Sequence, residues 1–206
     1  MKKIIVTIDG PAASGKEKIA KYISNKWKLT HLDSGILYRR LAHTFLIDKV
    51  DINNLNEIKE SIKKIHNISL RNSKQIRTQQ ISKLASKIAV HNFVRIFINK
   101  LQYDFVKKNQ NIRGFVIDGR DIGSVVFKKA DLKLYIEVKS EIRAKRRHKQ
   151  LIDTGEKSIY PKILKDIKDK LRKNSPLLVP KDAYIINNNG SFKNTIKQIS
   201  NLLENI

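Results

Sequence analysis

A glycine-rich turn near the start of the chain has the residue types and spacing that bind phosphate. Gly10 and Gly15 bracket four residues and Lys16 follows, which satisfies the pattern G-x-x-x-x-G-K. A β-branched run precedes this turn and apolar residues at helical spacing follow it, so an ordinary glycine turn is the less favoured interpretation. Between a strand and a helix, successive backbone N–H groups would cradle a triphosphate, and the lysine would reach the transferred phosphoryl group.

The residues after the lysine depart from the general pattern. That pattern continues with Ser or Thr, whose hydroxyl helps to hold a magnesium ion, but this chain continues with Glu17 and Lys18. Glu17 adds negative charge near the triphosphate, and Lys18 could partly offset it by contacting phosphate. We therefore expect an active but slow enzyme that uses ATP and Mg²⁺, and we assign no side chain as a direct metal ligand. The predicted nucleotide-binding residues are Gly10, Pro11, Ala12, Ala13, Ser14, Gly15, Lys16, Glu17 and Lys18.

Strands alternate with helices along the chain, which predicts an α/β fold with a mostly parallel sheet covered on both faces. The β-branched and apolar runs predict strands at residues 2–9, 29–32, 115–117, 132–138 and 184–186. Apolar residues at helical spacing predict helices that end near residue 27, that run through 37–45, and that cover 51–65, 78–107, 140–152, 160–172 and 191–204. The long helical stretch 78–107 should break near His91-Asn92.

Composition limits the classes of protein that the chain can be. No apolar run approaches the roughly 18 residues that a membrane span needs, and the absence of cysteine excludes disulfides and agrees with a cytoplasmic location. The net charge of +24 favours a polyanionic partner, but the lysines are dispersed through a chain rich in Lys, Ile and Asn. Charge alone therefore does not distinguish a kinase from an RNA-binding protein, and despite the net charge nucleic acid is not the expected partner.

Several stretches, taken in order and spacing, resemble bacterial cytidylate kinases over nearly the whole chain. They are Ile8-Asp9-Gly10-Pro11, Leu32-Asp33-Ser34-Gly35 with Tyr38-Arg39, Ile76-Arg77-Thr78-Gln79, Asp118-Gly119-Arg120-Asp121-Ile122-Gly123, Arg143-Ala144 with Arg146-Arg147, and Ser175-Pro176-Leu177. The resemblance implies a single domain, residues 1–206, with a P-loop NTPase core, a small acceptor-binding insertion at about 40–110 and a mobile lid at about 145–173. It also implies transfer of the γ-phosphoryl group of ATP to CMP or dCMP, with a monomer as the expected state.

The same resemblance assigns roles to single residues. It places Ser86, Arg95 and Asp121 around the acceptor base; cytosine has an N4 amino donor that suits a carboxylate, whereas uracil would face Asp121 acceptor to acceptor. Arg39 and Arg120 look like clamps on the acceptor phosphate. Lys16, Arg120 and Arg172 are the predicted catalytic residues. The predicted acceptor-binding residues are Asp33, Ser34, Gly35, Tyr38, Arg39, Ser86, Arg95, Arg120, Asp121 and Asp169.

Other interpretations stay open at this stage. A related nucleotide-binding protein with impaired catalysis would fit the unusual pair at positions 17 and 18, and an RNA-binding P-loop protein would fit the net charge of +24. A kinase for another small acceptor, such as thymidylate or shikimate, would share the core. The five histidines show no metal-ligand spacing, so we expect them to pack or to lie at the surface. Only about residues 68–75 occupy the place of a longer β-rich segment in relatives, so we expect a short connection there.

Overall fold

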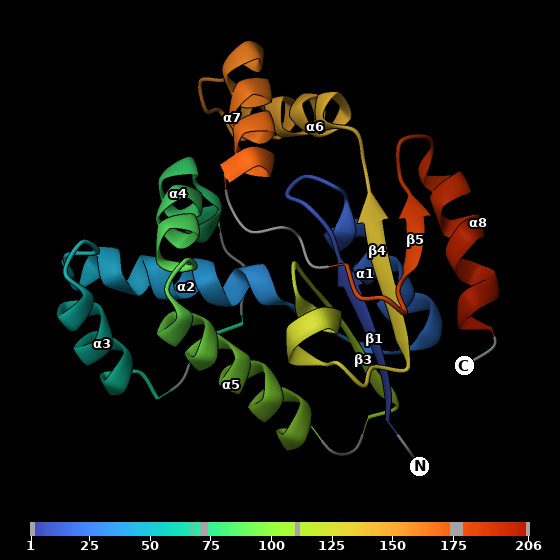
Figure 1. Cartoon of the computed structure of the whole chain (residues 1–206), viewed down its shortest axis with the longest axis horizontal. Coiled ribbons are helices and arrows are strands. Elements are labelled where there is room, and N and C mark those ends of the chain that lie inside the picture. The colour runs from blue at the N-terminus through green and yellow to red at the C-terminus, as the bar shows by residue number, and fades with distance from the viewer. Residues whose placement is uncertain (1–2, 67, 71–73, 110–111, 174–178, 205–206) are drawn as a thin grey trace. The chain divides into compact units, whose positions relative to one another are not determined.

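The chain forms two compact units in a computed structural model that describes residues 3–66, 68–70, 74–109, 112–173 and 179–204, with the backbone alone for 74 and 170–173 (Figure 1). The first, here called the sheet unit, comprises Met1–Leu32 and Ile112–Ile206. The second, the helical unit, comprises Asp33–Asn111. The helical unit covers the predicted acceptor-binding insertion, whose role remains a prediction.

A five-stranded sheet with the order β2-β3-β1-β4-β5 forms the centre of the fold. Its central strand β1 pairs in parallel with β3 and with β4, and β4 pairs in parallel with β5, which confirms the predicted parallel α/β fold. The strands are β1 (Ile4–Asp9), β2 (Thr30–Asp33), β3 (Gly114–Gly119), β4 (Leu132–Glu137) and β5 (Tyr184–Asn187). Each lies within a few residues of the run that predicted it.

One face of the sheet packs against α1 (Lys16–Trp27) and α8 (Phe192–Leu203). Alternate residues of β1 and β4 enter this core, including the fully buried Val6 and Ile8, because side chains at every second position share a face. Figure 1 shows α8 beside β5. A single turn of π-helix, η2 (Ile122–Val126), lies against the opposite face of β1, and the apolar pattern did not predict this turn.

Two further helices complete the sheet unit. They are α6 (Ser140–Asp153) and α7 (Tyr160–Lys173), which pack against each other in the segment predicted to be the lid. Glu141 Oε1 and Lys168 Nζ form an ion pair of 3.0 Å between them. Among the helices of the described residues, none is long and apolar enough to cross a bilayer.

The helical unit contains four α-helices and a 3₁₀ turn within its described residues. These are α2 (Ser34–Ile47), α3 (Leu55–Lys64), η1 (Lys74–Arg77), α4 (Gln79–Ile88) and α5 (Asn92–Lys108). The gap between α4 and α5 confirms the predicted break near His91-Asn92. Helix α3 begins later than predicted because the Asn54 side chain caps it by accepting the N–H groups of Asn56 and Glu57. The described residues between 50 and 77 include no strand, in agreement with the short connection that we expected.

Candidate active site

The phosphate loop, residues 10–16, is a tight turn between β1 and α1. Its backbone takes positive φ values at Gly10 (150°), Ala13 (60°) and Gly15 (90°). A Cβ atom on Gly10 would lie 2.7 Å from the carbonyl oxygen of Ile136, so a larger residue would push the loop away from β4. The loop leads directly into α1, whose first N–H groups have no partner within the helix. The structure thus has the strand, tight loop and helix that the sequence predicted, and binding of a triphosphate at this helix N-terminus stays a prediction.

The Lys16 ammonium lies across the phosphate loop. Its Nζ atom donates to the carbonyl oxygens of Gly10 (2.8 Å) and Pro11 (3.0 Å). These two hydrogen bonds hold the positive charge over the turn that would bind the triphosphate. Contact between this ammonium and a transferred phosphoryl group stays a prediction.

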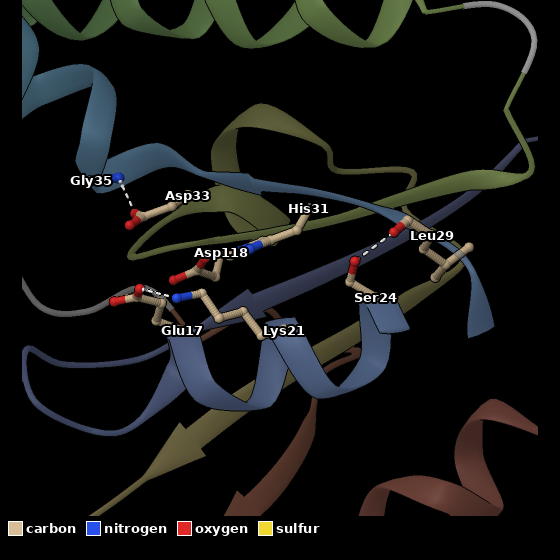
Figure 2. Close-up of polar contacts among 8 residues, drawn as sticks. All are labelled: Glu17, Lys21, Ser24, Leu29, His31, Asp33, Gly35 and Asp118. Carbon is tan, nitrogen blue, oxygen red and sulfur yellow. Dashed lines mark hydrogen bonds and ion pairs between the residues drawn. The ribbon is translucent and has the colours of Figure 1, made fainter. Parts of the chain in front are cut away.

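The two unusual residues after Lys16 both have partners away from the turn. Glu17 Oε1 accepts a hydrogen bond from Lys21 Nζ at 2.8 Å, one helical turn along α1 (Figure 2). Lys18 Nζ lies 4.2 Å from the ring centroid of Phe192 on α8. Lys21 thus offsets part of the negative charge that Glu17 brings to the start of α1. Contact between Lys18 and phosphate stays a prediction, and in the structure its ammonium stacks on an aromatic ring instead.

Side chains from the C-terminal third of the chain brace the phosphate loop. The carbonyl oxygen of Ser14 accepts hydrogen bonds from Asn188 Nδ2 (2.6 Å) and Arg146 Nη1 (3.2 Å). Thr195 Oγ1 donates to Asn188 Oδ1 at 2.7 Å, which fixes the orientation of the amide. A Cβ atom on Gly15 would lie 2.7 Å from Asn188 Nδ2, so this brace also requires glycine at that position. Sequence analysis assigned no role to Asn188 or Thr195.

A buried carboxylate at the end of β1 is a second feature that the sequence did not reveal. Asp9 is 1% exposed, and its two oxygens accept the backbone N–H groups of Ile122 (2.8 Å) and Gly123 (2.7 Å). These residues directly follow Arg120 and Asp121, so Asp9 ties the predicted acceptor-binding turn to the strand that carries the phosphate loop. Burial raises the pKa of Asp9 from 3.8 to about 6, and the two backbone hydrogen bonds limit this rise.

The raised pKa of Asp9 should make stability depend on pH. The folded chain binds this proton more tightly than the unfolded chain, so the contribution of Asp9 is fully present below pH 3.8 and is lost as pH rises through about 6. The difference in unfolding free energy between wild type and Asp9→Asn should therefore shift by about 2 kcal/mol, against wild type, from about pH 4 to about pH 7. Urea unfolding at four pH values would measure it. A difference that stays constant with pH would contradict the raised pKa.

Two acidic residues in the stretches that carry the family resemblance have structural hydrogen bonds (Figure 2). Asp118 Oδ1 lies 2.6 Å from His31 Nε2, and both side chains are largely buried, so His31 packs within the sheet unit as expected. Asp33 Oδ1 accepts the backbone N–H of Gly35 at 2.8 Å and so caps α2. The cap explains locally why the stretch that begins at Asp33 opens a helix.

The predicted acceptor-binding residues are distributed over both units. In the helical unit, Ser34 and Arg39 lie on the first turns of α2, Ser86 lies on α4 and Arg95 on the first turn of α5. Ser86 Oγ donates to the carbonyl oxygen of Ser82 at 2.9 Å. Asp33, Gly35 and Tyr38 also belong to the helical unit, and Arg120, Asp121 and Asp169 belong to the sheet unit. That all of them bind one acceptor nucleotide stays a prediction.

The catalytic role of Arg172 also stays a prediction. Its backbone continues α7, and its side chain lies outside the described residues. The stretch Ser175-Pro176-Leu177, which carries part of the resemblance, lies outside them as well.

The parallel sheet with a braced G-x-x-x-x-G-K loop between β1 and α1 defines a P-loop nucleotide-binding fold. Two solved structures share this fold. TT1252 from Thermus thermophilus matches with a TM-score of 0.57 at 14% identity, covering 100% of this chain and 99% of that chain. A shikimate kinase from Bacteroides thetaiotaomicron matches with a TM-score of 0.52 at 10% identity, covering 98% of each. At these identities the likeness concerns the fold alone.

Sequence relatives identify the family within this fold. The family model for cytidylate kinase matches residues 6–205. A cytidylate kinase from Rickettsia akari is 36% identical over 210 residues, which cover 99% of this chain and 93% of the relative. Another from Bartonella henselae is 36% identical over 191 residues, which cover 90% and 87%. The chain belongs to the cytidylate kinase family, which confirms the resemblance found in the sequence.

Proposed function

We propose that this protein transfers the γ-phosphoryl group of ATP to CMP or dCMP and releases ADP with CDP or dCDP. The observation that supports this most directly is the braced phosphate loop with Lys16 across it, in a chain that matches the cytidylate kinase family over residues 6–205. We propose further that it acts as a monomer in the cytoplasm, in pyrimidine nucleotide metabolism.

The phosphate loop would hold the triphosphate of ATP. Backbone N–H groups at the start of α1 and the ammonium of Lys16 supply the positive end of the site. A magnesium ion would neutralise phosphate charge during transfer. Residue 17 offers no hydroxyl, and its carboxylate pairs with Lys21, so the ion would bind mainly through phosphate oxygens and water. Reduced anchoring of the ion by the protein is the physical reason to expect slow turnover and a raised need for magnesium.

The acceptor would be recognised at its phosphate and at its base. Arg39 and Arg120 would bind the phosphate through two-pronged guanidinium contacts. Ser86, Arg95 and Asp121 would read the hydrogen-bonding edge of cytosine. Asp169 would hold the sugar, and Asp33, Ser34, Gly35 and Tyr38 would form and line the turn beside the phosphate. Phosphoryl transfer needs little acid–base chemistry, so positioning and charge stabilisation would supply most of the catalysis.

A panel of acceptors with ATP and magnesium tests the proposal. Coupled release of ADP should be fast with CMP and dCMP and at least about 10-fold slower with UMP and AMP, because a mismatched base leaves a charged group without its hydrogen bond. Thymidylate and shikimate belong in the same panel, since kinases for these acceptors share the core. Equal rates with UMP and CMP would refute the assignment. Nucleotide binding without turnover on any acceptor would favour a relative with impaired catalysis.

A further inference from the structure

Arg143, on the first turn of α6, is a buried guanidinium that forms no ion pair with a carboxylate of the described residues. It is 4% exposed, and its buried Nε atom has no hydrogen-bond partner within that part of the chain. Among the described residues, its side chain has one hydrogen bond, from Nη2 to Ser140 Oγ at 3.3 Å. Glu141, the nearest carboxylate on the helix, forms its ion pair with Lys168. A buried charge without a carboxylate partner is costly, because neither water nor an opposite charge compensates for its desolvation.

Arg143 lies on the helix that follows β4, the strand next to the one that leads into the phosphate loop. Helix α6 follows the carboxyl end of β4, and β4 pairs with β1, where Tyr135 lies opposite Asp9. Arg120 follows the carboxyl end of β3, on the other side of β1. The ends of three adjacent strands thus carry an arginine, the phosphate loop and a second arginine.

The charges around Arg143 further favour the binding of an anion beside it. Burial lowers its pKa, and the positive charge of Arg120 lowers it further, while Tyr135 and Glu141 act in the opposite direction. The carboxylate of Asp9 is close enough to Tyr135 to contribute to the raised pKa of its phenol, which is mainly due to burial. This carboxylate already accepts hydrogen bonds from two backbone N–H groups. Two guanidinium groups therefore share this end of the sheet with no carboxylate paired to Arg143 among the described residues.

We propose that Arg143 is a further catalytic residue that binds the phosphoryl group during its transfer, between Lys16 and Arg120. The inference rests on the proposed function, since it takes the nucleotide phosphate as the anion. A guanidinium offers planar, two-pronged donors to phosphate oxygens, and in a water-poor site such donors stabilise the charge that develops during transfer. The buried Nε–H group of Arg143 is the donor from which an oxygen of the phosphoryl group would accept a hydrogen bond.

Kinetics of matched variants test the catalytic part. Arg143→Met should lower kcat about 100-fold with little change in the KM for ATP, because the contact strengthens during transfer. Arg143→Lys should recover part of this loss, since it restores the charge without the planar fork. The control Lys145→Met removes the same charge from an exposed position on the same helix and should leave kcat within about twofold of wild type. A kcat for Arg143→Met within about threefold of wild type would overturn the proposal.

Thermal unfolding gives a measurement that does not depend on turnover. If no carboxylate compensates for the buried charge of Arg143, its replacement by an apolar side chain of similar volume should stabilise the protein when no anion is bound. Without added anion, Arg143→Met should therefore melt about 2–4 °C higher than wild type. Inorganic tripolyphosphate should raise the melting temperature of wild type and Lys145→Met more than that of Arg143→Met. A lower melting temperature for Arg143→Met together with an unchanged tripolyphosphate shift would show a structural role and overturn the proposal. An Arg143-dependent tripolyphosphate shift in a wild type that does not phosphorylate CMP would refute the proposed function and leave the anion site standing.

Discussion

Lys16→Ala is expected to lower kcat by about 1000-fold while leaving the fold intact. The ammonium lies over the phosphate loop, where it would contact charge that moves from one nucleotide to the other, so its loss should appear in the chemical step. The side chain is not part of the apolar core of the sheet unit, and its hydrogen bonds to Gly10 and Pro11 are only partly buried. Steady-state kinetics with CMP, together with circular dichroism and a urea midpoint, would measure both parts.

Lys26→Ala provides the matched control for this prediction. Lys26 lies near the end of the same helix, with its ammonium 4.6 Å from the ring centroid of Trp27, far along α1 from the phosphate loop. Its removal changes net charge equally and should alter kcat by less than about twofold. If Lys16→Ala retained the wild-type rate, the phosphate loop would not work as proposed.

Asp121→Asn should reduce the preference for CMP over UMP by about 10- to 150-fold. The carboxylate would accept the N4 amino group of cytosine and repel the O4 carbonyl of uracil, whereas an amide can donate to that carbonyl. The range corresponds to one hydrogen bond to a charged group, worth about 1.5–3 kcal/mol. The backbone oxygen of Asp121, which accepts from Val125 at 2.9 Å, stays in place, so the turn should keep its shape. The measurement is the ratio of kcat/KM for the two acceptors, with the KM for ATP expected to change little.

An exposed carboxylate on α7 supplies the control for the base preference. Asp166→Asn makes the same chemical change at a position in the sheet unit that is open to solvent. The CMP to UMP ratio should then stay at the wild-type value. A ratio that Asp121→Asn leaves unchanged would mean that another group selects the base.

The sequence predicted most of the fold because the main elements are encoded locally. Apolar runs such as Phe115-Val116-Ile117 are buried in the sheet, whereas the start of α3 was predicted only to within a few residues because the cap at Asn54 was not recognised. The π-helical turn at Ile122–Val126 was missed, since its shape comes from hydrogen bonds to Asp9 and not from a repeating apolar pattern. The glycine spacing also predicted the phosphate loop, because the close approach to β4 excludes a side chain at Gly10.

The parts of the site that the sequence did not reveal depend on distant partners. Asp9 bonds to an amide 113 residues away, and Asn188 bonds to a carbonyl 174 residues away. Asn, Thr and Asp are common in ordinary turns and caps, so their types alone give no indication of such contacts. Arg143 is a further example. Its motif, Arg143-Ala144, is visible in the sequence, but only the packing of α6 shows that no carboxylate of the described residues pairs with it.

The contact between Asn188 and Ser14 has a consequence for how the protein is made. A ribosome adds Asn188, which braces the phosphate loop, 174 residues after Ser14, the loop residue that it contacts, and Thr195, which orients Asn188, follows 7 residues later. Contacts between residues so far apart in sequence form late, because the intervening chain must first be ordered. A growing chain that has not yet reached Thr195 therefore carries the loop without its support, and tight nucleotide binding should begin only once α8 has docked on the sheet.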